Sequence, residues 1–295
     1  MPFSWRPRVR RWGRLLVDRN RERIRSRLAT EGRLLLVPRP PLGGRGHVEH
    51  YYHFLFDLVL PLSQVMDGLD PSCRVVLRPV GLFDDRIREI FGHRVEIASE
   101  GDPHAPARPM PLVGMNPECV LSTASDLDGL RRLVFERYRI GHVNRPDLVV
   151  LVRRLPPDDF YRHSAVIPGG GAWRRSIPNH DDLRSALAEA IRPDHRLLDL
   201  RLETMPFREQ LETFARTALL VGQHGAGLAN TIWMDRGQTL LEISHAHAWR
   251  HFEFLCQARG QPFLRYGTPG PHSIVDPARL VAWARRQPVL RELLR

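Results

Sequence analysis

The stretch Leu148-Val149-Val150-Leu151-Val152 is a continuous apolar run rich in β-branched residues. Such a run is typical of a strand covered on both faces, as in a parallel sheet flanked by helices. Arg153 and Arg154 follow it directly. We therefore expect a buried strand with two guanidinium groups at its carboxyl end.

Similar short β-type runs alternate with helical patterns along most of the chain, which predicts βαβ units and an α/β fold with parallel sheets. We expect one helix that has Asn179 as its N-cap and ends at Pro193. A second helix is expected to begin near Pro206. Residues 38–46 and 103–114, rich in Pro and Gly, are predicted to be loops. The predicted strands are residues 34–37, 74–77, 95–98, 148–152, 197–200, 219–221 and 239–243.

The length and composition are those of an ordinary globular protein. The chain has 295 residues, 42% of them apolar and 26% charged, which allows two domains and gives no sign of wholesale disorder. The polar stretch 141–147 is the best domain boundary, so we expect an Arg-rich segment 1–30 and domains 31–145 and 146–295. No apolar run is long enough for a transmembrane helix, and residues 1–30 lack the core of a signal peptide. The three cysteines, Cys73, Cys119 and Cys256, are isolated, which favours a reducing cytoplasm.

The positive charge is concentrated at the N-terminus. Residues 1–33 hold eleven Arg and three acidic residues, so most of the net charge of +11 lies there. A nucleic-acid binder would carry its basic stripe on the folded surface, so we expect no nucleic-acid partner. Apolar residues among the Arg, such as Trp12, Leu15 and Leu16, are typical of an amphipathic segment on an anionic membrane. The alternative is a poorly ordered, solvated terminus.

A glycine turn follows the predicted strand 219–221. The turn carries His224, Gly225, Ala226 and Gly227, and a helical pattern that includes Asn230 comes next. A strand, a glycine turn and a helix N-terminus together can bind a phosphate, because free backbone N–H groups and the helix dipole favour an anion. Gly225 and Gly227 would let the backbone approach that phosphate. The alternative is glycine required only by the geometry of the turn.

Charged groups at other strand ends extend this interpretation. Glu242 ends the predicted strand 239–243, where a carboxylate can accept hydrogen bonds from a ribose, or simply face water. Arg153, Arg154 and Arg175 could clamp a diphosphate through bidentate hydrogen bonds. In a chain with 44 basic residues, a solvated face is the competing interpretation.

One dense cluster in the first half suggests acid–base chemistry. If residues 50–57 open a helix, His53 and Asp57 lie at i and i+4, and the carboxylate can orient the imidazole as a general base. The alternative is a buried pair that only ties the helix to its neighbours. Neither of two histidine groups has a good fourth zinc ligand, so we expect no zinc at His47, His50 and His53 or at His245, His247 and His251.

Several ordered blocks resemble one family. His50 to Asp57 resembles the motif N-Y-Y-H-W-L-F-D, residues 152–154 resemble S-R-R, and residues 175–179 resemble R-x-I-x-N. Gln210 matches an E-Q helix, and residues 224–230 with 241–243 resemble H-G-A-G-L-x-N followed by an E-I strand. In this order and spacing, over roughly residues 47–266, the blocks resemble the family 61 glycosyltransferases.

The resemblance implies a GT-B-like fold, with two Rossmann-like domains facing a central cleft and the donor nucleotide on the C-terminal domain. It also implies inverting transfer from a nucleotide sugar, with a UDP-sugar favoured, to a glycan or lipid-linked hydroxyl. Bacterial relatives suggest capsule or surface-polysaccharide synthesis in the cytoplasm, with possible peripheral contact at the inner membrane. Together with the residues above, this gives His53 and Asp57 as the catalytic pair. No divalent metal or other cofactor is expected to be required.

The chain departs from the family pattern at three positions. Phe54 replaces the usual Trp, Val152 the usual Ser, and His50 the common Asn. A catalytically degenerate nucleotide- or sugar-binding protein is therefore the alternative function. An Arg-rich binder of anionic surfaces, built around residues 1–33, is a third.

Overall fold

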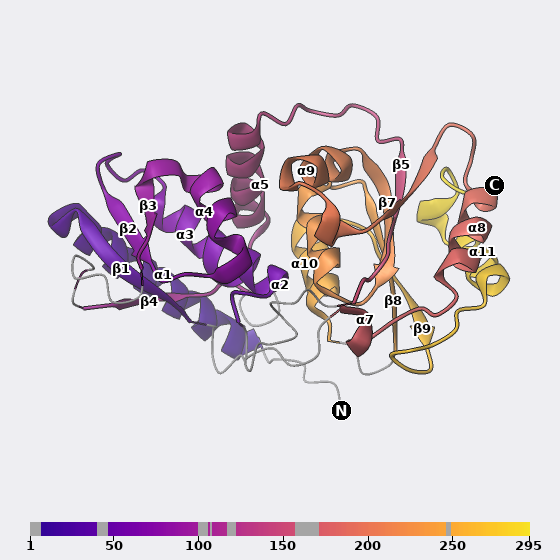
Figure 1. The fold of residues 1–295 in the computed structure, drawn as a ribbon, viewed down its shortest axis with the longest axis horizontal. Coiled ribbons are helices and arrows are strands. Elements are labelled where there is room, and N and C mark those ends of the chain that lie inside the picture. The colour runs from indigo at the N-terminus through magenta and orange to yellow at the C-terminus, as the bar shows by residue number, and fades with distance from the viewer. Residues whose placement is uncertain are drawn as a thin grey trace. The chain divides into compact units, whose positions relative to one another are not determined.

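The computed structural model describes residues 7–39, 47–99, 106, 108–116, 122–156, 171–245 and 249–295. The chain divides into two compact units, Met1–Arg139 (unit 1) and Ile140–Arg295 (unit 2). Each unit is an α/β fold around a parallel sheet (Figure 1). The predicted α/β class with parallel sheets is therefore confirmed.

The sheet of unit 1 contains β1 (Arg33–Arg39), β2 (Arg74–Leu77), β3 (Val95–Ile97) and β4 (Met110–Val113). Its strand order is β3-β2-β1-β4, and all neighbours are parallel. Successive residues of β2 are buried, as expected for a strand with packed elements on both faces. The surrounding helices are α1 (Pro7–Glu31), α2 (Tyr51–His53), α3 (Leu60–Met66), α4 (Asp84–Phe91) and α5 (Ala124–Tyr138), with the short 3₁₀ segments η2 (Gly81–Phe83) and η3 (Gly92–Arg94).

A π-helical segment, η1 (Phe54–Val59), joins α2 to α3. Leu60 donates its N–H to the carbonyl of Leu55, five residues earlier. Pro61 follows and has no N–H to donate to the carbonyl of Asp57, so an unbroken α-helical ladder cannot form here. Single turns of π-helix are often found at functional sites.

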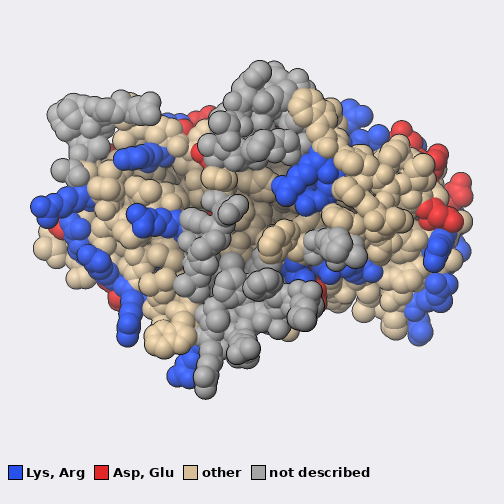
Figure 2. All heavy atoms as spheres, turned by 90° about the horizontal axis from the view of Figure 1, so that it is seen from below, with Lys and Arg blue, Asp and Glu red and all other residues tan. Residues whose placement is uncertain are grey.

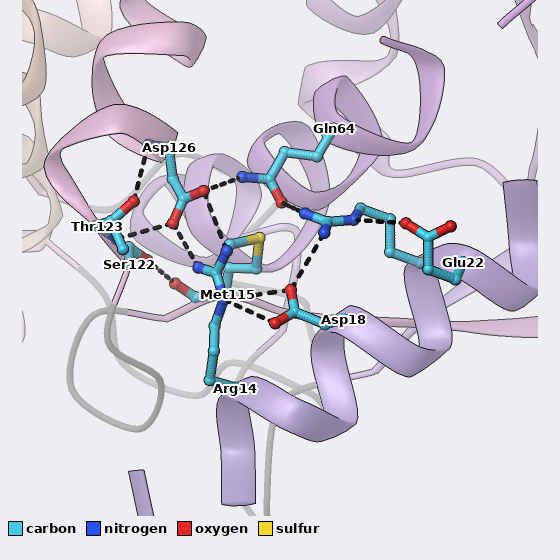
Figure 3. Close-up of polar contacts among 9 residues, drawn as sticks. Arg14, Asp18, Glu22, Gln64, Met115, Ser122, Thr123 and Asp126 are labelled. Carbon is cyan, nitrogen blue, oxygen red and sulfur yellow. Dashed lines mark hydrogen bonds and ion pairs between the residues drawn. The ribbon is translucent and has the colours of Figure 1, made fainter. Parts of the chain in front are cut away.

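The Arg-rich N-terminal segment forms a helix within unit 1. The inner face of α1 buries Val17, Ile24 and Leu28. On the same side Arg14 pairs with Asp126 of α5, and the amide of Gln64 in α3 donates to the same carboxylate (Figure 3). These contacts make Pro7–Glu31 part of the packing of unit 1, not a solvated tail. Within the described part of the chain, no helix is long and apolar enough to cross a membrane.

The sheet of unit 2 has the strand order β6-β5-β7-β8-β9, again all parallel. Its strands are β5 (Leu148–Val152), β6 (Arg196–Leu200), β7 (Thr217–Gln223), β8 (Thr239–His245) and β9 (Phe263–Thr268). Its helices are α7 (Gly171–Arg174), α8 (His180–Ala190), α9 (Phe207–Ala215), α10 (His251–Arg259) and α11 (Pro277–Arg285), with the 3₁₀ segments η4 (Leu202–Thr204), η5 (Ala226–Trp233) and η6 (Pro288–Leu290). Apolar residues of α8 and α11 share one core with β5, β7 and β8.

Two strands differ from the sequence predictions. The expected loop 103–114 contains β4, an edge strand in which Pro111 pairs with Val37. Proline is tolerated there because an edge strand has one side free of ladder hydrogen bonds. Strand β9 was not predicted, since it is a half-buried edge strand without a continuous apolar run.

The expected cap of α8 also differs. Asn179 occupies the N-cap position, but its side chain makes no capping bond. Its amide nitrogen donates to the carbonyl of Val275 (2.7 Å), and its oxygen accepts from the N–H of Val275 (3.0 Å). Asn179 therefore ties α8 to the segment before α11.

Candidate functional site

The topology of each sheet marks one place where a ligand is expected. In unit 1 the chain runs from β1 outward to β3 and resumes on the other side of β1 at β4; in unit 2 it does the same around β5 and β7. In open parallel sheets, ligands bind at the carboxyl ends of the two strands that flank such a switch in direction. The expected sites are the carboxyl ends of β1 and β4, and those of β5 and β7.

Arg153 and Arg154 follow β5 and make different contacts. Arg153 donates to Asp199 at the end of β6 (2.8 Å) and also pairs with Asp181 of α8. Its charge is therefore neutralised within unit 2. Arg154 instead donates to the carbonyls of Gly171 (2.8 Å) and His224 (3.3 Å), and no carboxylate of the described residues lies within ion-pair distance of it.

Arg175 joins Arg154 at the end of β7. Its guanidinium donates to the same carbonyl of His224, at 3.4 Å. Burial, together with the neighbouring charge of Arg175, lowers the pKa of Arg154 to about 10. Burial and the charge of Arg174 also lower the pKa of Arg175. Two partly buried guanidinium groups meet at one carbonyl, which is an arrangement that would favour an anion.

The glycine turn makes room for Arg154. A Cβ on Gly225 would lie 1.7 Å from Arg154 Nη1, and one on Gly227 would lie 3.0 Å from Leu202 Cδ1. The open side of Gly225, expected to admit a phosphate, is thus filled by the guanidinium. Ala226 is half-buried and begins η5. Asn230 is fully buried; its amide nitrogen donates a hydrogen bond to the carbonyl of Gly227, and its oxygen accepts one from the indole N–H of Trp233. These two hydrogen bonds fix the 3₁₀ segment η5 from inside.

His224 and Glu242 form a buried pair. Nδ1 of His224 lies 2.5 Å from Oε1 of Glu242, and Arg265 of β9 donates to the other carboxylate oxygen at 3.3 Å. Glu242 has no exposed surface. Its carboxylate therefore orients His224, and it is not exposed for the contact with a ribose that we expected. Burial lowers the pKa of His224 although Glu242 opposes this shift, so the imidazole is neutral at pH 7. With Nδ1 hydrogen-bonded to Glu242, Nε2 is the nitrogen left for other contacts.

A cavity of about 270 Å³ lies at this edge of unit 2. Its lining comes from the end of β5, the segment before α8 and the end of β7: Val152, Arg153, Arg154, Leu155, Ser176, Ile177, Pro178, His180, Asp181, Arg201 and Gln223. The cavity therefore lies at the switch point of the sheet and shares Arg154 with the glycine turn.

In unit 1 the predicted pair is formed at the end of β4. Nδ1 of His53 lies 2.6 Å from Oδ2 of Asp57, with the His53 side chain 22% exposed and that of Asp57 2% exposed. Gly114 follows β4, and a Cβ there would lie 2.2 Å from Asp57 Oδ1. Tyr52 donates to the side chain of Asn116 at 3.0 Å, which holds the helical stretch against the segment after β4. A partly exposed imidazole on a buried carboxylate can accept a proton from a hydroxyl.

A larger groove in unit 1, of about 700 Å³, lies elsewhere. It is lined by residues of α1, α3, α4 and α5 and contains neither His53 nor Asp57. Its charged lining is mixed and includes Arg21, Arg25 and Arg94 together with Glu22, Asp67 and Asp126. We therefore take the switch point as the candidate site of unit 1.

The histidine groups considered for zinc give no such site in the part of the chain that the structure describes. No three His, Cys, Asp or Glu side chains of these residues gather so as to hold a metal ion. His247 lies outside the described residues. His251 instead stacks on His224, with ring centroids 6.0 Å apart.

Sequence reasoning missed four residues of these sites. Arg265 lies on the unpredicted strand β9, and Asp199 reaches Arg153 only through strand pairing. Gly114 was assigned to a loop. Gln223 was visible in the glycine turn beside His224, but nothing local set it apart.

Comparison with known proteins adds an independent finding. Residues 51–241 match the family described as Glycosyltransferase 61. Over 95 residues the chain is 26% identical to a mouse (Mus musculus) protein named EGF domain-specific O-linked N-acetylglucosamine transferase. This similarity covers 32% of the chain and 18% of the mouse protein, so the chain spans only a small part of that protein's length.

Proposed function

This chain belongs to the glycosyltransferase 61 family, and from that premise we propose that it transfers a sugar, with inversion, from a nucleotide sugar to a hydroxyl group. The family and the mouse relative both support sugar transfer. A UDP-sugar is the favoured donor, and a glycan or lipid-linked glycan is the acceptor. Capsule or surface-polysaccharide synthesis is the proposed setting.

The observation that carries the proposal is the meeting of Arg154 and Arg175 at the carbonyl of His224. These two groups would bind the donor diphosphate and stabilise the charge that develops on it as the sugar leaves. Nε2 of the neutral His224 is an acceptor and would accept a hydrogen bond from a hydroxyl of the sugar, with Glu242 positioning the ring. Arg153 would support the site through Asp199. With two cations at the diphosphate, no divalent metal is obligatory.

The proposed base is His53, oriented by Asp57. As the acceptor oxygen bonds to the anomeric carbon, its proton passes to His53 and the bond between that carbon and the diphosphate breaks. One base is enough for a single displacement, and the product is inverted. This mechanism requires unit 1 and unit 2 to face a common cleft, as in a GT-B enzyme, and that arrangement is part of the proposal.

Turnover of a donor tests this function. The purified chain is incubated with UDP-N-acetylglucosamine and UDP-xylose, with hydroxyl acceptors and without, and UDP release is followed. Release of UDP from at least one donor, together with a product of inverted anomeric configuration by NMR, is expected. Nucleotide binding without transfer or donor hydrolysis would favour the catalytically degenerate alternative.

A second proposal concerns the outer face of α1, which would lie on an anionic membrane surface. Trp12, Leu15 and Leu16 are 67%, 41% and 44% exposed, and the exposed Arg19 and Arg23 continue the same face at helical spacing. Basic side chains are prominent on the surface of unit 1 in Figure 2. Apolar insertion combined with attraction to anionic lipid is typical of an interfacial helix. The proposed location is the cytoplasmic side of the inner membrane.

Vesicle sedimentation tests this surface. The chain is expected to sediment with phosphatidylglycerol vesicles but not with phosphatidylcholine vesicles, and less so at high salt. The double variant Leu15→Ser/Leu16→Ser should lose binding, whereas Leu82→Ser, at a Leu that is 49% exposed elsewhere in unit 1, should retain it. Equal binding by both variants would contradict the proposal.

A further inference from the structure

Gln223, the last residue of β7, has a side chain fixed in one orientation. Its amide nitrogen donates to the carbonyls of Pro271 (2.8 Å) and Ser176 (3.1 Å). Turning the amide over would place its oxygen against both carbonyl oxygens, so the positions of nitrogen and oxygen are determined. The side chain is 7% exposed and lines the cavity at the β5/β7 edge.

The oxygen of this amide is buried and has no hydrogen-bond partner among the described residues. Buried polar groups in proteins are nearly always hydrogen-bonded, so such an acceptor calls for a partner from outside. Gln223 is one of the residues that line the cavity at the switch point of the sheet, where the expected partner is a ligand. Because the oxygen is shielded from solvent, side chains around it must move for a ligand to reach it. The resulting hydrogen bond would then be shielded from water.

The chemistry of this group limits what it can bind. Phosphate oxygens accept hydrogen bonds, so they would be repelled by the Gln223 oxygen and attracted to Arg154 in the same cavity. The group at Gln223 must therefore carry an N–H or O–H. In a nucleoside diphosphate these donors belong to the base and the ribose.

We propose that the cavity holds the nucleoside of the donor and that the side-chain oxygen of Gln223 accepts a hydrogen bond from it. This inference rests on the proposed function, because it places the diphosphate at Arg154 and Arg175. It makes Gln223 a specificity residue of the donor site.

Calorimetric titration of the unmodified chain with UDP, CDP and 2′,3′-dideoxy-UDP separates the two sources of the donor group. Uridine has an N–H at position 3 of its base, where cytidine has an acceptor. If the base binds Gln223, CDP should bind about tenfold more weakly than UDP, which corresponds to about 1.4 kcal/mol. If the ribose binds, the dideoxy compound should be the weak one. Equal affinity for all three would overturn the proposal.

Gln223→Met removes the acceptor and keeps the length of the side chain. It should weaken UDP binding about tenfold and abolish the discrimination among the three nucleotides. Gln287→Met is the matched control, because that amide also donates to a backbone carbonyl, of Trp283 (3.1 Å), and lies outside the cavity. Discrimination that persists in Gln223→Met would overturn the contact. Absence of binding by all three nucleotides to the unmodified chain would overturn the donor site as well.

Discussion

Each unit carries a histidine–carboxylate pair at the switch point of its sheet, and the pairs His53–Asp57 and His224–Glu242 differ in their surroundings. His53 is 22% exposed above Asp57, whose side chain is 2% exposed. His224 is 5% exposed, its Glu242 is shared with Arg265, and Arg175 lies at its carbonyl. The more exposed pair in unit 1 is therefore suited to proton transfer. The buried pair in unit 2 is suited to positioning a ligand by an uncharged imidazole.

The largest expected effect is at His53. His53→Ala should lower turnover by about 10²- to 10⁴-fold, the usual cost of losing a general base, while UDP affinity stays unchanged. His93→Ala, at an exposed histidine of the same unit, is the control and should keep full turnover. A folded His53→Ala chain with normal turnover would remove the proposed role.

A smaller effect is expected at the neighbouring arginines of unit 2. Arg154→Ala should raise the dissociation constant for UDP by about 10- to 100-fold, since hydrogen bonds to charged groups are worth about 1.5–3 kcal/mol. Arg153→Ala should change it much less, because the partners of Arg153 are Asp199 and Asp181. Calorimetric titration distinguishes them, and equal losses would contradict the different roles given to the two residues.

Two glycines allow the comparison to be tested by adding one methyl group to each unit. Gly114→Ala would push Asp57 aside and should lower turnover about tenfold without changing UDP affinity. Gly225→Ala would displace the guanidinium of Arg154 and should weaken UDP binding by a similar factor. Gly129→Ala in α5, where a Cβ meets nothing within 4 Å, is the control. If Gly225→Ala lowered turnover while UDP affinity stayed normal, the two assignments would have to be exchanged.

The smallest effect is the pH dependence of stability. The pKa of His224 is lowered by burial, so the unfolded chain binds a proton at higher pH than the folded chain does. Stability should therefore fall as pH drops below about 6.5, the ordinary histidine value, towards the lowered pKa. Burial also lowers the pKa of His180, so His224→Gln should remove only part of the loss of stability at low pH. Urea unfolding at pH 7.5 and 5.5 measures the free energy of unfolding at both values. If the loss of stability between them were as large in His224→Gln as in the unmodified chain, a neutral His224 would be contradicted.

Local pattern was enough to predict the strands with continuous apolar cores. Residues 148–152 and 74–77 were predicted with the bounds that β5 and β2 have, and the helical spacing of His53 and Asp57 predicted their contact. The edge strands β4 and β9 escaped prediction because half-buried edges carry proline and polar residues. The partners of Arg153 and Glu242 come from strands distant in sequence, so no local pattern could predict them.

The departures from the family pattern look different once they are located. Phe54 is fully buried in η1, and Val152 is 8% exposed at the end of β5. Phe54 therefore serves packing, whereas Val152 also lines the cavity at the β5/β7 edge. The support that the substitution at Phe54 gave to a degenerate, non-catalytic protein is weaker than the sequence suggested.

Nucleotide binding to the arginines of unit 2 is the most direct test of the central claim. Thermal unfolding of the chain is followed with UDP, GDP, CMP and TDP, in EDTA and in Mn²⁺. A ligand present at 100 times its dissociation constant raises the free energy of unfolding by about 2.7 kcal/mol, which raises Tm by roughly 5 to 10 °C. We predict such a shift with UDP in EDTA, and none in Arg154→Ala/Arg175→Ala. No shift with any nucleotide, or an equal shift in the double variant, would contradict the donor site.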